Sequence, residues 1–545
     1  MRIDLRLTSP LEKVFLDEAP RGGYRRSSAL LGETASFQAA WTILEGASRD
    51  YVSLEIASGV PARVRMVKSV PVRLAAFPDA DADYLRKAPG LYPDLLEEAG
   101  EERWRAYAGL WTCAWIDVEG APAGTHEIAV VLKAGDGEVL ARADFRLDVI
   151  AATLPKQALI HTKWFHCDAL CHFYGVEMWS EKFWEICENF VAAMPRRGIN
   201  MLLTPIHTPP LDTREGGERM TCQLVDVSAG NSGYSFGFGK LERWVEMAKR
   251  CGIEYFEMAH LFTQWGAKHA PKIVADVCGE EKRLFGWDTE ATGTLYRDFL
   301  RAYLPALTAE LRKLGIAERC YFHISDEPSL AMLDDYRAAR DMVSEYLEGF
   351  PVMDALSNFA FYETGAVAKP IPATNHIEPF LEAGVKGLWT YYCLGQYKLV
   401  SNTFLAMPSY RTRILGFQLY KYGIEGFLQW AYNFYGAQFS DYSVDPFRVT
   451  DGDGFAPAGD TFQVYPGKDG KPLESLRMMV IAEAMDDLRA FQLLESFKGK
   501  DFVMAILEDG VEPITFDQYP RSADYILDAR EKVNRAIEAC LGRVK

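Results

Sequence analysis

The sequence predicts two folded parts of different class: an N-terminal antiparallel β-sandwich, followed by an α/β domain in the form of a (β/α)8 barrel of the TIM type. Up to about residue 153, short segments alternate apolar and polar residues between Gly, Pro and Asp turns, as half-buried strands do. From residue 158 onward, short apolar runs alternate with amphipathic helical segments, which is typical of parallel strands joined by crossover helices.

The first domain is expected to span residues 1–153 and to hold several short strands. The segments that alternate most regularly are 36–44, 51–56, 62–67, 125–132 and 141–150. The stretch 79–102 lacks this alternation and is predicted to be a long loop. Residues 151–155 form the expected linker into the second domain.

The second domain is expected to span residues 154–496, because eight strand–helix units follow one another there. The apolar runs are 158–165, 199–206, 253–261, 320–324, 351–356, 373–377, 387–391 and 426–432. Helices are expected at 181–196, 240–251, 292–314, 333–347 and 474–495. An open doubly wound sheet is the alternative, although no Gly-rich turn follows the first strand. Residues 497–545 are expected to form a helical tail packed on the barrel.

Composition and charge exclude several classes of protein. The 545 residues are 49% hydrophobic and 25% charged, which is ordinary for a globular protein. The net charge of −17 argues against nucleic acid and against an anionic membrane surface as partners. No apolar run reaches the length of about 18 residues that spans a bilayer, so no membrane insertion is expected. Early charges in the chain are unlike a signal sequence, so a cytoplasmic location is predicted, or a secreted or periplasmic one if a signal was removed.

Polar and aromatic side chains gather where the predicted strands end, which in a barrel is the face that carries the active site. The candidate substrate-binding residues there are Trp164, His166, His207, His323, Asn358, Tyr391, Tyr392, Trp430 and Asn433. These groups suit a sugar, because a sugar ring has an apolar face and a rim of hydroxyls. We expect no cofactor and no metal ion, since the Cys- and His-containing run 166–172 has no second cluster to complete a zinc site. The Gly-rich run 233–239 is predicted to be a mobile loop over the barrel mouth.

The most distinctive motif is Asp326-Glu327-Pro328 at the end of the fourth predicted strand. Glycoside hydrolysis needs a carboxylic acid that protonates the leaving oxygen and a second group that stabilises or attacks the anomeric carbon. Many barrel glycosidases supply that group as a Glu on strand seven, but the run 387–393 holds no carboxylate. A 2-acetamido group of the substrate can take that role, and adjacent Asp and Glu residues suit such substrate-assisted hydrolysis. They can face one pocket only if the strand has ended, which Pro328 supports.

Three other interpretations of these residues remain open. The same tripeptide is common as a helix cap, with Asp at the N-cap and Pro in the first turn. Glu378 or Glu257 is a candidate for a separate nucleophile or base, in a glycosidase for sugars without an acetamido group. A degenerate barrel that binds carbohydrate without cleaving it is the non-enzymatic alternative.

Several motifs resemble those of glycoside hydrolase family 123. In the predicted barrel they are Asp326-Glu327-Pro328, Gly459-Asp460, Val464-Tyr465-Pro466-Gly467 and Ser475-Leu476-Arg477. The motifs similar to the accessory β-sandwich of this family are Gly32-Glu33, Ser36-Phe37-Gln38, Gly90-Leu91-Tyr92-Pro93-Asp94, Leu110-Trp111 and Pro122-Ala123-Gly124-Thr125. The resemblance therefore extends over most of the chain.

The resemblance implies an exo-acting, retaining β-N-acetylgalactosaminidase. Such an enzyme would release terminal β-linked N-acetylgalactosamine, or another 2-acetamido sugar, through an oxazolinium intermediate. By the same resemblance, Asp326 would orient the acetamide and Glu327 would be the acid/base. The implied partner is a carbohydrate substrate, the terminal amino sugar of a glycan or glycolipid, and a homo-oligomer is left open.

Overall fold

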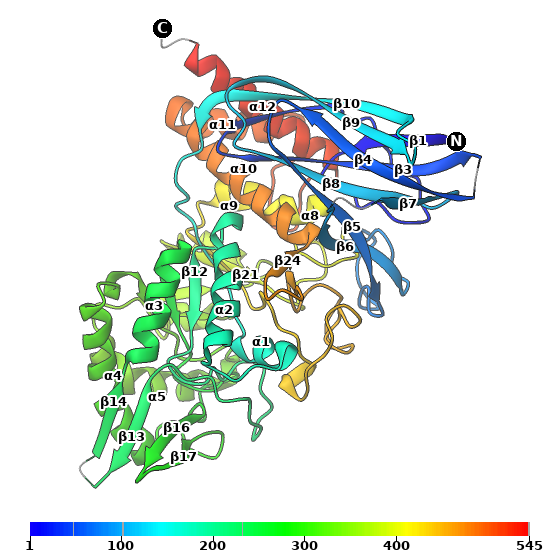
Figure 1. The fold of residues 1–545 in the computed structure, drawn as a ribbon. Helices are drawn as coiled ribbons and strands as arrows, with labels where there is room; N and C mark the ends of the chain where they lie inside the picture. Colours follow the sequence, from blue (N-terminus) through cyan, green and yellow to red (C-terminus); the bar gives the residue numbers. More distant parts are fainter. Residues whose placement is uncertain (47, 101–102, 232, 543–545) are drawn as a thin grey trace.

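The computed structural model describes residues 1–46, 48–100, 103–231 and 233–542. In Figure 1 the N-terminal strands, coloured blue and cyan, lie at one end of the molecule beside the C-terminal helices, coloured orange and red. The green segments of the middle of the chain lie at the other end. Within the described ranges, no helix has the length and the apolar character that are needed to cross a membrane.

The N-terminal region contains two five-stranded sheets. The first has the order β1-β3-β8-β5-β6, with β1 (Arg2–Thr8), β3 (Thr34–Glu45), β5 (Ala62–Val72), β6 (Gly90–Glu98) and β8 (Thr112–Glu119). The second has the order β2-β10-β9-β4-β7, with β2 (Arg26–Leu31), β4 (Arg49–Ser58), β7 (Trp104–Tyr107), β9 (Gly124–Ala134) and β10 (Val139–Thr153). One buried cluster contains side chains of both sheets, with Phe37 stacked on Phe145 at 4.1 Å. The predicted antiparallel sheets are confirmed, apart from the parallel pair of β2 and β10.

The prediction of a loop over residues 79–102 is wrong in part, because residues 90–98 form β6 and pair with β5. Five consecutive residues of β6 are buried, so this strand lacks the alternation of a half-buried strand. Pro93, which cannot donate to a ladder, lies where the register with β5 shifts. Residues 101–102 of the predicted loop lie outside the described residues.

The middle region contains six parallel strands in the order β18-β15-β12-β11-β22-β21. They are β11 (Ile160–Lys163), β12 (Met201–Thr204), β15 (Tyr255–Met258), β18 (Cys320–Tyr321), β21 (Trp389–Tyr392) and β22 (Gly426–Gln429). A further parallel pair consists of β19 (Met353–Ala355) and β20 (Lys369–Ile371). Parallel bridges connect this pair to the six strands, from Val352 to Phe322 and from Ala373 to Tyr391. The strands therefore form curled parallel sheets within an α/β region.

Seven of the eight predicted apolar runs overlap a parallel strand. The sixth prediction, 373–377, is wrong because β20 ends at Ile371. Pro370 and Pro372 lie within and directly after this strand, and proline is disfavoured in a regular ladder. The proline pattern thus concealed the strand.

Helices and short elements connect these strands in sequence. The α-helices are α1 (Cys167–Tyr174), α2 (Glu181–Ala193), α3 (Gly239–Cys251), α4 (Thr294–Lys313), α5 (Leu333–Val343), α6 (Ala360–Glu363), α7 (Glu378–Glu382), α8 (Ser409–Arg413), α9 (Leu415–Tyr422), α10 (Leu476–Lys498), α11 (Lys500–Leu507) and α12 (Ala523–Leu541). The 3-10 turns are Pro195–Arg197, Ala317–Arg319, Leu330–Met332, Ser344–Leu347 and Gln438–Ser440. A small hairpin, β23 (Val464–Pro466) and β24 (Pro472–Glu474), precedes α10.

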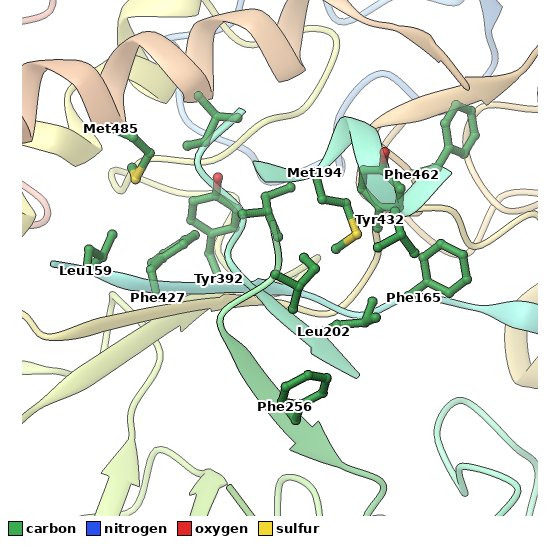
Figure 2. Close-up of a cluster of buried hydrophobic side chains, with 14 of the residues drawn as sticks. Leu159, Phe165, Met194, Leu202, Phe256, Tyr392, Phe427, Tyr432, Phe462 and Met485 are labelled. Carbon is green, nitrogen blue, oxygen red and sulfur yellow. The ribbon is translucent and has the colours of Figure 1, made fainter. Parts of the chain in front are cut away.

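Figure 2 shows part of the core between the parallel strands and α10. The rings of Tyr392 on β21 and Phe427 on β22 lie 4.8 Å apart between centroids. Leu202, Phe256 and Met485 belong to the same cluster, and each of these five side chains is at most 1% exposed. Full burial of one such side chain stabilises the fold by about 1.5–3 kcal/mol. Both faces of the strands are apolar, as expected of parallel strands that are covered on both sides.

The Gly-rich run is not a mobile loop over the strand ends, so that prediction is wrong. Residues 233–237 form β14 (Gly233–Gly237), which pairs with β13 (Asp226–Gly230) in a four-stranded sheet with β16 (Ile273–Val277) and β17 (Glu280–Phe285). Its alternate residues Tyr234 and Phe236 pack on Phe299 of α4, at 5.2 and 6.0 Å between ring centroids. In Figure 1 this sheet lies at the end of the molecule opposite the N-terminal strands. The two aromatic residues are two positions apart, so both rings lie on one face of a strand. This spacing indicates a strand and was overlooked in the sequence.

Buried ion pairs join the start of α10 to the N-terminal sheets. Arg477 of α10 pairs with Asp94 of β6 at 2.9 Å, and both side chains are at most 1% exposed. Glu474, at the end of β24, accepts hydrogen bonds from Arg65 of β5 and from Arg197. These contacts hold the first sheet against α10, β24 and the 3-10 turn Pro195–Arg197.

Helix α12 packs on α10 and on β2 and β10. Its Arg530 pairs with Asp487 of α10 at 2.9 Å and with Glu33, which follows β2. Arg413 of α8 also binds Asp487, at 2.7 Å. The C-terminal segment therefore contacts both α10 and the N-terminal sheets.

The Asp94–Arg477 pair yields a stability prediction. Asp94→Asn leaves the buried guanidinium without its counter-charge, and removing one partner of such a pair costs about 3–5 kcal/mol. The exposed pair of Arg21 and Asp524 offers a control, because these side chains are 72% and 63% exposed. Asp524→Asn should change the unfolding free energy by less than about 1 kcal/mol. Urea unfolding followed by tryptophan fluorescence measures both, and equal midpoints would contradict the role given to Asp94.

Candidate active site

A pocket of about 150 Å³ lies at the carboxyl ends of the parallel strands. Five of the residues singled out in the sequence line it: Trp164, Asp326, Glu327, Tyr391 and Trp430. They follow or belong to β11, β18, β21 and β22, which are not consecutive in the chain. The strand order brings them to one edge, so a single cavity has this adjacent carboxyl pair and an aromatic wall.

The carboxyl pair is held by the backbone on both sides. The Trp265 amide donates to the Asp326 carbonyl oxygen at 2.7 Å, and the Glu327 amide donates to the Ala355 carbonyl oxygen at 3.0 Å. Glu327 has a φ of 44°, a left-handed conformation that side chains other than glycine rarely adopt. This turn interrupts the alternation of a strand, so that both side chains line the same pocket.

The pKa values of both carboxyl groups are raised in this pocket. Burial raises the pKa of Asp326 well above its usual range, and the negative charge of Glu327 raises it further. Burial of the Glu327 carboxyl also raises its pKa, while the hydrogen bond that Tyr391 donates to Oε1 opposes this rise. Glu327 as a whole residue remains exposed, so substrate can reach it. The pair therefore retains a proton at pH values at which isolated carboxyl groups are ionised.

A buried histidine lies beneath this pair, between two carboxylates. His323 Nε2 is 2.8 Å from Glu257 Oε1, and His323 Nδ1 is 3.2 Å from Asp354 Oδ1. Burial alone would lower the pKa of His323, but the two carboxylates raise it to about 9. The ring is therefore an imidazolium at neutral pH, and its positive charge lowers the pKa of Asp326 in opposition to burial.

The ligand geometry allows one candidate metal group, made of His260, His323 and Asp354. The rings of His260 and His323 are stacked at 4.2 Å between centroids. Both ring nitrogens of His323 already interact with carboxylates, so a bound cation would have to replace one of these two interactions. The arrangement fits a charged imidazole better than a metal ligand.

Two buried carboxylates hold the tryptophans of the pocket from behind. Trp164 Nε1 donates to Glu257 Oε1 at 2.8 Å, and Trp430 Nε1 donates to Asp460 Oδ2 at 2.8 Å. Thr162 also donates to Glu257. Burial raises the pKa of Asp460 to about 7. The indole planes are thus fixed before any ligand arrives.

Six residues predicted to bind substrate lie outside the pocket lining: His166, His207, His323, Asn358, Tyr392 and Asn433. Tyr392 packs in the core of Figure 2, and Asn358 accepts a hydrogen bond from the Ala360 amide in a local turn. Asn433 exchanges two hydrogen bonds with the backbone of His166, at 2.9 and 3.0 Å. These residues support the strand ends, because position at a strand end does not determine where a side chain points.

The two carboxylates considered as a separate nucleophile or base also lie outside this lining. Glu257 is fully buried and accepts hydrogen bonds from Thr162, Trp164 and His323. Glu378 is the first residue of α7 and is exposed.

Sequence patterns missed other residues of the pocket, including Asp212, Gln264, Trp265, Phe439 and Phe455. They lie on loops whose conformation has no periodic signal. Asp212, Trp265 and Phe439 have φ values of 41°, 59° and 61°. With Glu327, four left-handed residues therefore line one cavity, and such strained positions cluster at functional sites.

The pocket has adjacent carboxyl groups beside fixed aromatic planes, at the ends of parallel strands. This combination is typical of an enzyme that cleaves carbohydrates. A family model described as the catalytic domain of glycoside hydrolase 123 matches residues 164–494, more than half of the chain. The chain belongs to glycoside hydrolase family 123. The resemblance seen in the motifs is thereby confirmed, and the protein is a glycoside hydrolase.

One solved structure shows the same fold, and two others are similar at a lower level. A family 123 glycoside hydrolase from Clostridium perfringens, reported in a study of glycolipid glycan hydrolysis, has a TM-score of 0.75 and 14% identity, over 99% of this chain and 98% of that one. A putative β-galactosidase from Bacteroides fragilis has a TM-score of 0.31 and 9% identity, over 84% of this chain and 58% of that one. A β-glucuronidase from Parabacteroides merdae has a TM-score of 0.32 and 10% identity, over 89% of this chain and 52% of that one. No curated protein sequence matches the chain.

The charge of His323 can be tested through Glu257→Gln. Loss of one carboxylate should lower the pKa of His323 from about 9, as NMR titration of the imidazole would show. A raised folded-state pKa stabilises the protein below the unfolded value of about 6.5, and this contribution is lost as the pH rises through about 9. The variant should therefore be destabilised most below pH 6.5, by about 3–5 kcal/mol, and least above pH 9. A stability difference that does not depend on pH would contradict an imidazolium at this position.

Proposed function

We propose that the protein is an exo-acting, retaining glycoside hydrolase that releases a terminal β-linked 2-acetamido sugar, N-acetylgalactosamine in the first place, by substrate-assisted catalysis. The observation that carries this proposal is the adjacent pair Asp326 and Glu327 in one pocket. Neither Glu257 nor Glu378 lines that pocket, so neither is placed to act as a separate nucleophile.

In the proposed reaction, Glu327 donates its proton to the leaving oxygen while the acetamide carbonyl oxygen attacks the anomeric carbon. The bond to the leaving group breaks, and an oxazolinium ion forms. Asp326 accepts a hydrogen bond from the acetamide N–H and stabilises its positive charge. Glu327, now ionised, takes a proton from water, which attacks the anomeric carbon and reopens the ring with net retention. The raised pKa of the carboxyl pair supports a proton held there for the leaving oxygen, and the positive charge of His323, which lowers the pKa of Asp326, favours Glu327 as the group that donates it.

The size of the pocket supports removal of one terminal sugar. Its volume of about 150 Å³ corresponds to about ten waters at roughly 15 Å³ each, which is room for a single sugar ring. Trp164 and Trp430 provide planes on which such a ring can stack. The Clostridium perfringens structure was reported in connection with glycolipid glycan hydrolysis, which supports a glycolipid glycan as the substrate class.

We infer that the strands of the middle region close into the (β/α)8 barrel of residues 154–496. The strand order and the two parallel bridges that connect β19 and β20 to their neighbours support this. The cluster shared by both N-terminal sheets supports a β-sandwich over residues 1–153, and residues 497–545 form the C-terminal tail.

One observation favours a second candidate function. Asp212 is a third carboxyl group in the pocket wall. In a glycosidase for sugars without an acetamido group, Asp212 would be the nucleophile or the base, and Glu327 the acid.

The decisive experiment is hydrolysis of nitrophenyl β-glycosides of N-acetylgalactosamine, N-acetylglucosamine, galactose and glucose. The proposal expects cleavage of acetamido sugars alone. Glu327→Gln should reduce kcat by about 10²–10⁴-fold on natural linkages, because general acid catalysis contributes that much. Asp326→Asn should also reduce kcat, because the acetamide N–H then lacks its carboxylate partner. Cleavage of galactosides or glucosides at similar rates would overturn substrate assistance.

Tyr391→Phe should alter the pH profile more than the rate. The Tyr391 hydrogen bond lowers the pKa of Glu327, so its loss should raise that pKa and shift the alkaline limb of kcat/KM to higher pH. The loss in kcat should be about tenfold or less, since one hydrogen bond to a charged group is removed. Tyr392→Phe is the control, because Tyr392 lies in the core. A shift of the limb to lower pH in the Tyr391 variant would contradict the assignment.

A further inference from the structure

Asp212 follows β12 and lines the same pocket as Asp326 and Glu327. It has no role in the proposed reaction. Its backbone is fixed on both sides. The Asp212 amide donates to Gln264 Oε1 at 2.6 Å, and its carbonyl oxygen accepts from Ser440 Oγ at 2.8 Å. Gln264 also donates to the Thr213 carbonyl oxygen at 3.0 Å. Three loops thus hold Asp212 in a left-handed conformation.

The carboxyl group of Asp212 is available for a ligand. Oδ2 is buried without a hydrogen-bond partner among the described residues. The backbone amides of Phe439 and Ser440 hold the carboxyl group by hydrogen bonds, so Oδ2 is the oxygen left without a partner in the described part of the chain. Burial raises the pKa of Asp212 to about 6, and Arg219 opposes the rise. The group is therefore mostly an ionised, acceptor-only carboxylate at neutral pH.

Aromatic rings complete the surroundings of this carboxylate. Trp265 and Phe439, both in the pocket wall, meet edge to face at 5.8 Å between centroids. The Arg214 guanidinium lies 4.8 Å from the centre of the Phe439 ring. A carboxylate acceptor beside apolar ring faces matches a sugar, whose hydroxyls donate and whose C–H face is apolar.

We propose that Asp212 accepts a hydrogen bond from a ring hydroxyl of the terminal sugar and thereby selects which sugar enters, with Trp265 and Phe439 against its apolar face. This proposal rests on the proposed function, which identifies the ligand of the pocket as a terminal sugar. Selection follows because a sugar without a hydroxyl at that place leaves the buried carboxylate oxygen without a partner.

Binding titrations test this role separately from hydrolysis. Tryptophan fluorescence is the readout, since Trp164, Trp265 and Trp430 line the pocket. The probes are methyl β-N-acetylgalactosaminide and its 3-, 4- and 6-deoxy analogues, with the methyl β-galactoside series in parallel. Asp212→Asn should raise Kd for the parent sugar about ten- to hundredfold. For one deoxy analogue, wild type and variant should bind equally.

The matched control is Glu215→Gln, in the same loop, whose side chain is 79% exposed. It should bind every probe as wild type does. Circular dichroism and thermal unfolding of Asp212→Asn establish that the variant is folded. If the variant lost affinity equally for all analogues, Asp212 would have a structural role only, and the proposal would fail.

Two further results would overturn the proposal. Unchanged Kd values for every probe would show that Asp212 meets no hydroxyl. Unchanged binding with abolished turnover that azide restores would make Asp212 the nucleophile. Failure of the proposed function would give a different result, because wild type would then bind the plain methyl β-galactoside more tightly than the acetamido sugar. The role of Asp212 would still be tested, by comparing the deoxy analogues of methyl β-galactoside.

Discussion

The site depends on one buried charge arrangement, the His323 imidazolium between Glu257 and Asp354. Asp354 also accepts hydrogen bonds from the backbone amides of Ile324 and Ser325, at 3.0 and 3.3 Å, directly before Asp326 and Glu327. Its second oxygen accepts from Tyr336 of α5. Each carboxylate therefore has several donors, which is what allows buried charge to persist in a protein interior.

From this arrangement, constraints extend to both sides of the pocket. On one side Glu257 fixes the indole of Trp164. On the other side Asp354 fixes the chain that leads into Asp326 and Glu327. The strained left-handed turn at Glu327 persists because the Asp326 carbonyl oxygen and the Glu327 amide are both hydrogen-bonded. Preorganisation of this kind places charges where the reaction needs them, without rearrangement during catalysis.

The remainder of the molecule supports the site from a distance. Helix α10 lies on one side of the parallel strands, with the core of Figure 2 between them, and its Arg477 pairs with Asp94 of the first N-terminal sheet. The N-terminal sheets and α12 contact the same helix, so they stabilise the frame without reaching the pocket.

The sequence by itself determined the alternation of apolar runs and helices, the antiparallel character of the N-terminal region, and the motif Asp326-Glu327. These are local properties, since periodicity and short motifs are set by neighbours along the chain. It failed at β6, buried on consecutive residues, and at β20, which is interrupted by prolines. Both strands form because of the neighbouring segments that pair with them and bury them, and a local sequence pattern does not show these neighbours.

The tertiary structure alone decided which side chains meet in the pocket. It brought Trp164, Tyr391 and Trp430 to the carboxyl pair but directed His323 beneath it and Tyr392 into the core. It also added Asp212, Trp265 and Phe439 from loops. The physical reason is that a strand end fixes the position of a residue, whereas packing and hydrogen bonds from distant segments fix the direction of its side chain.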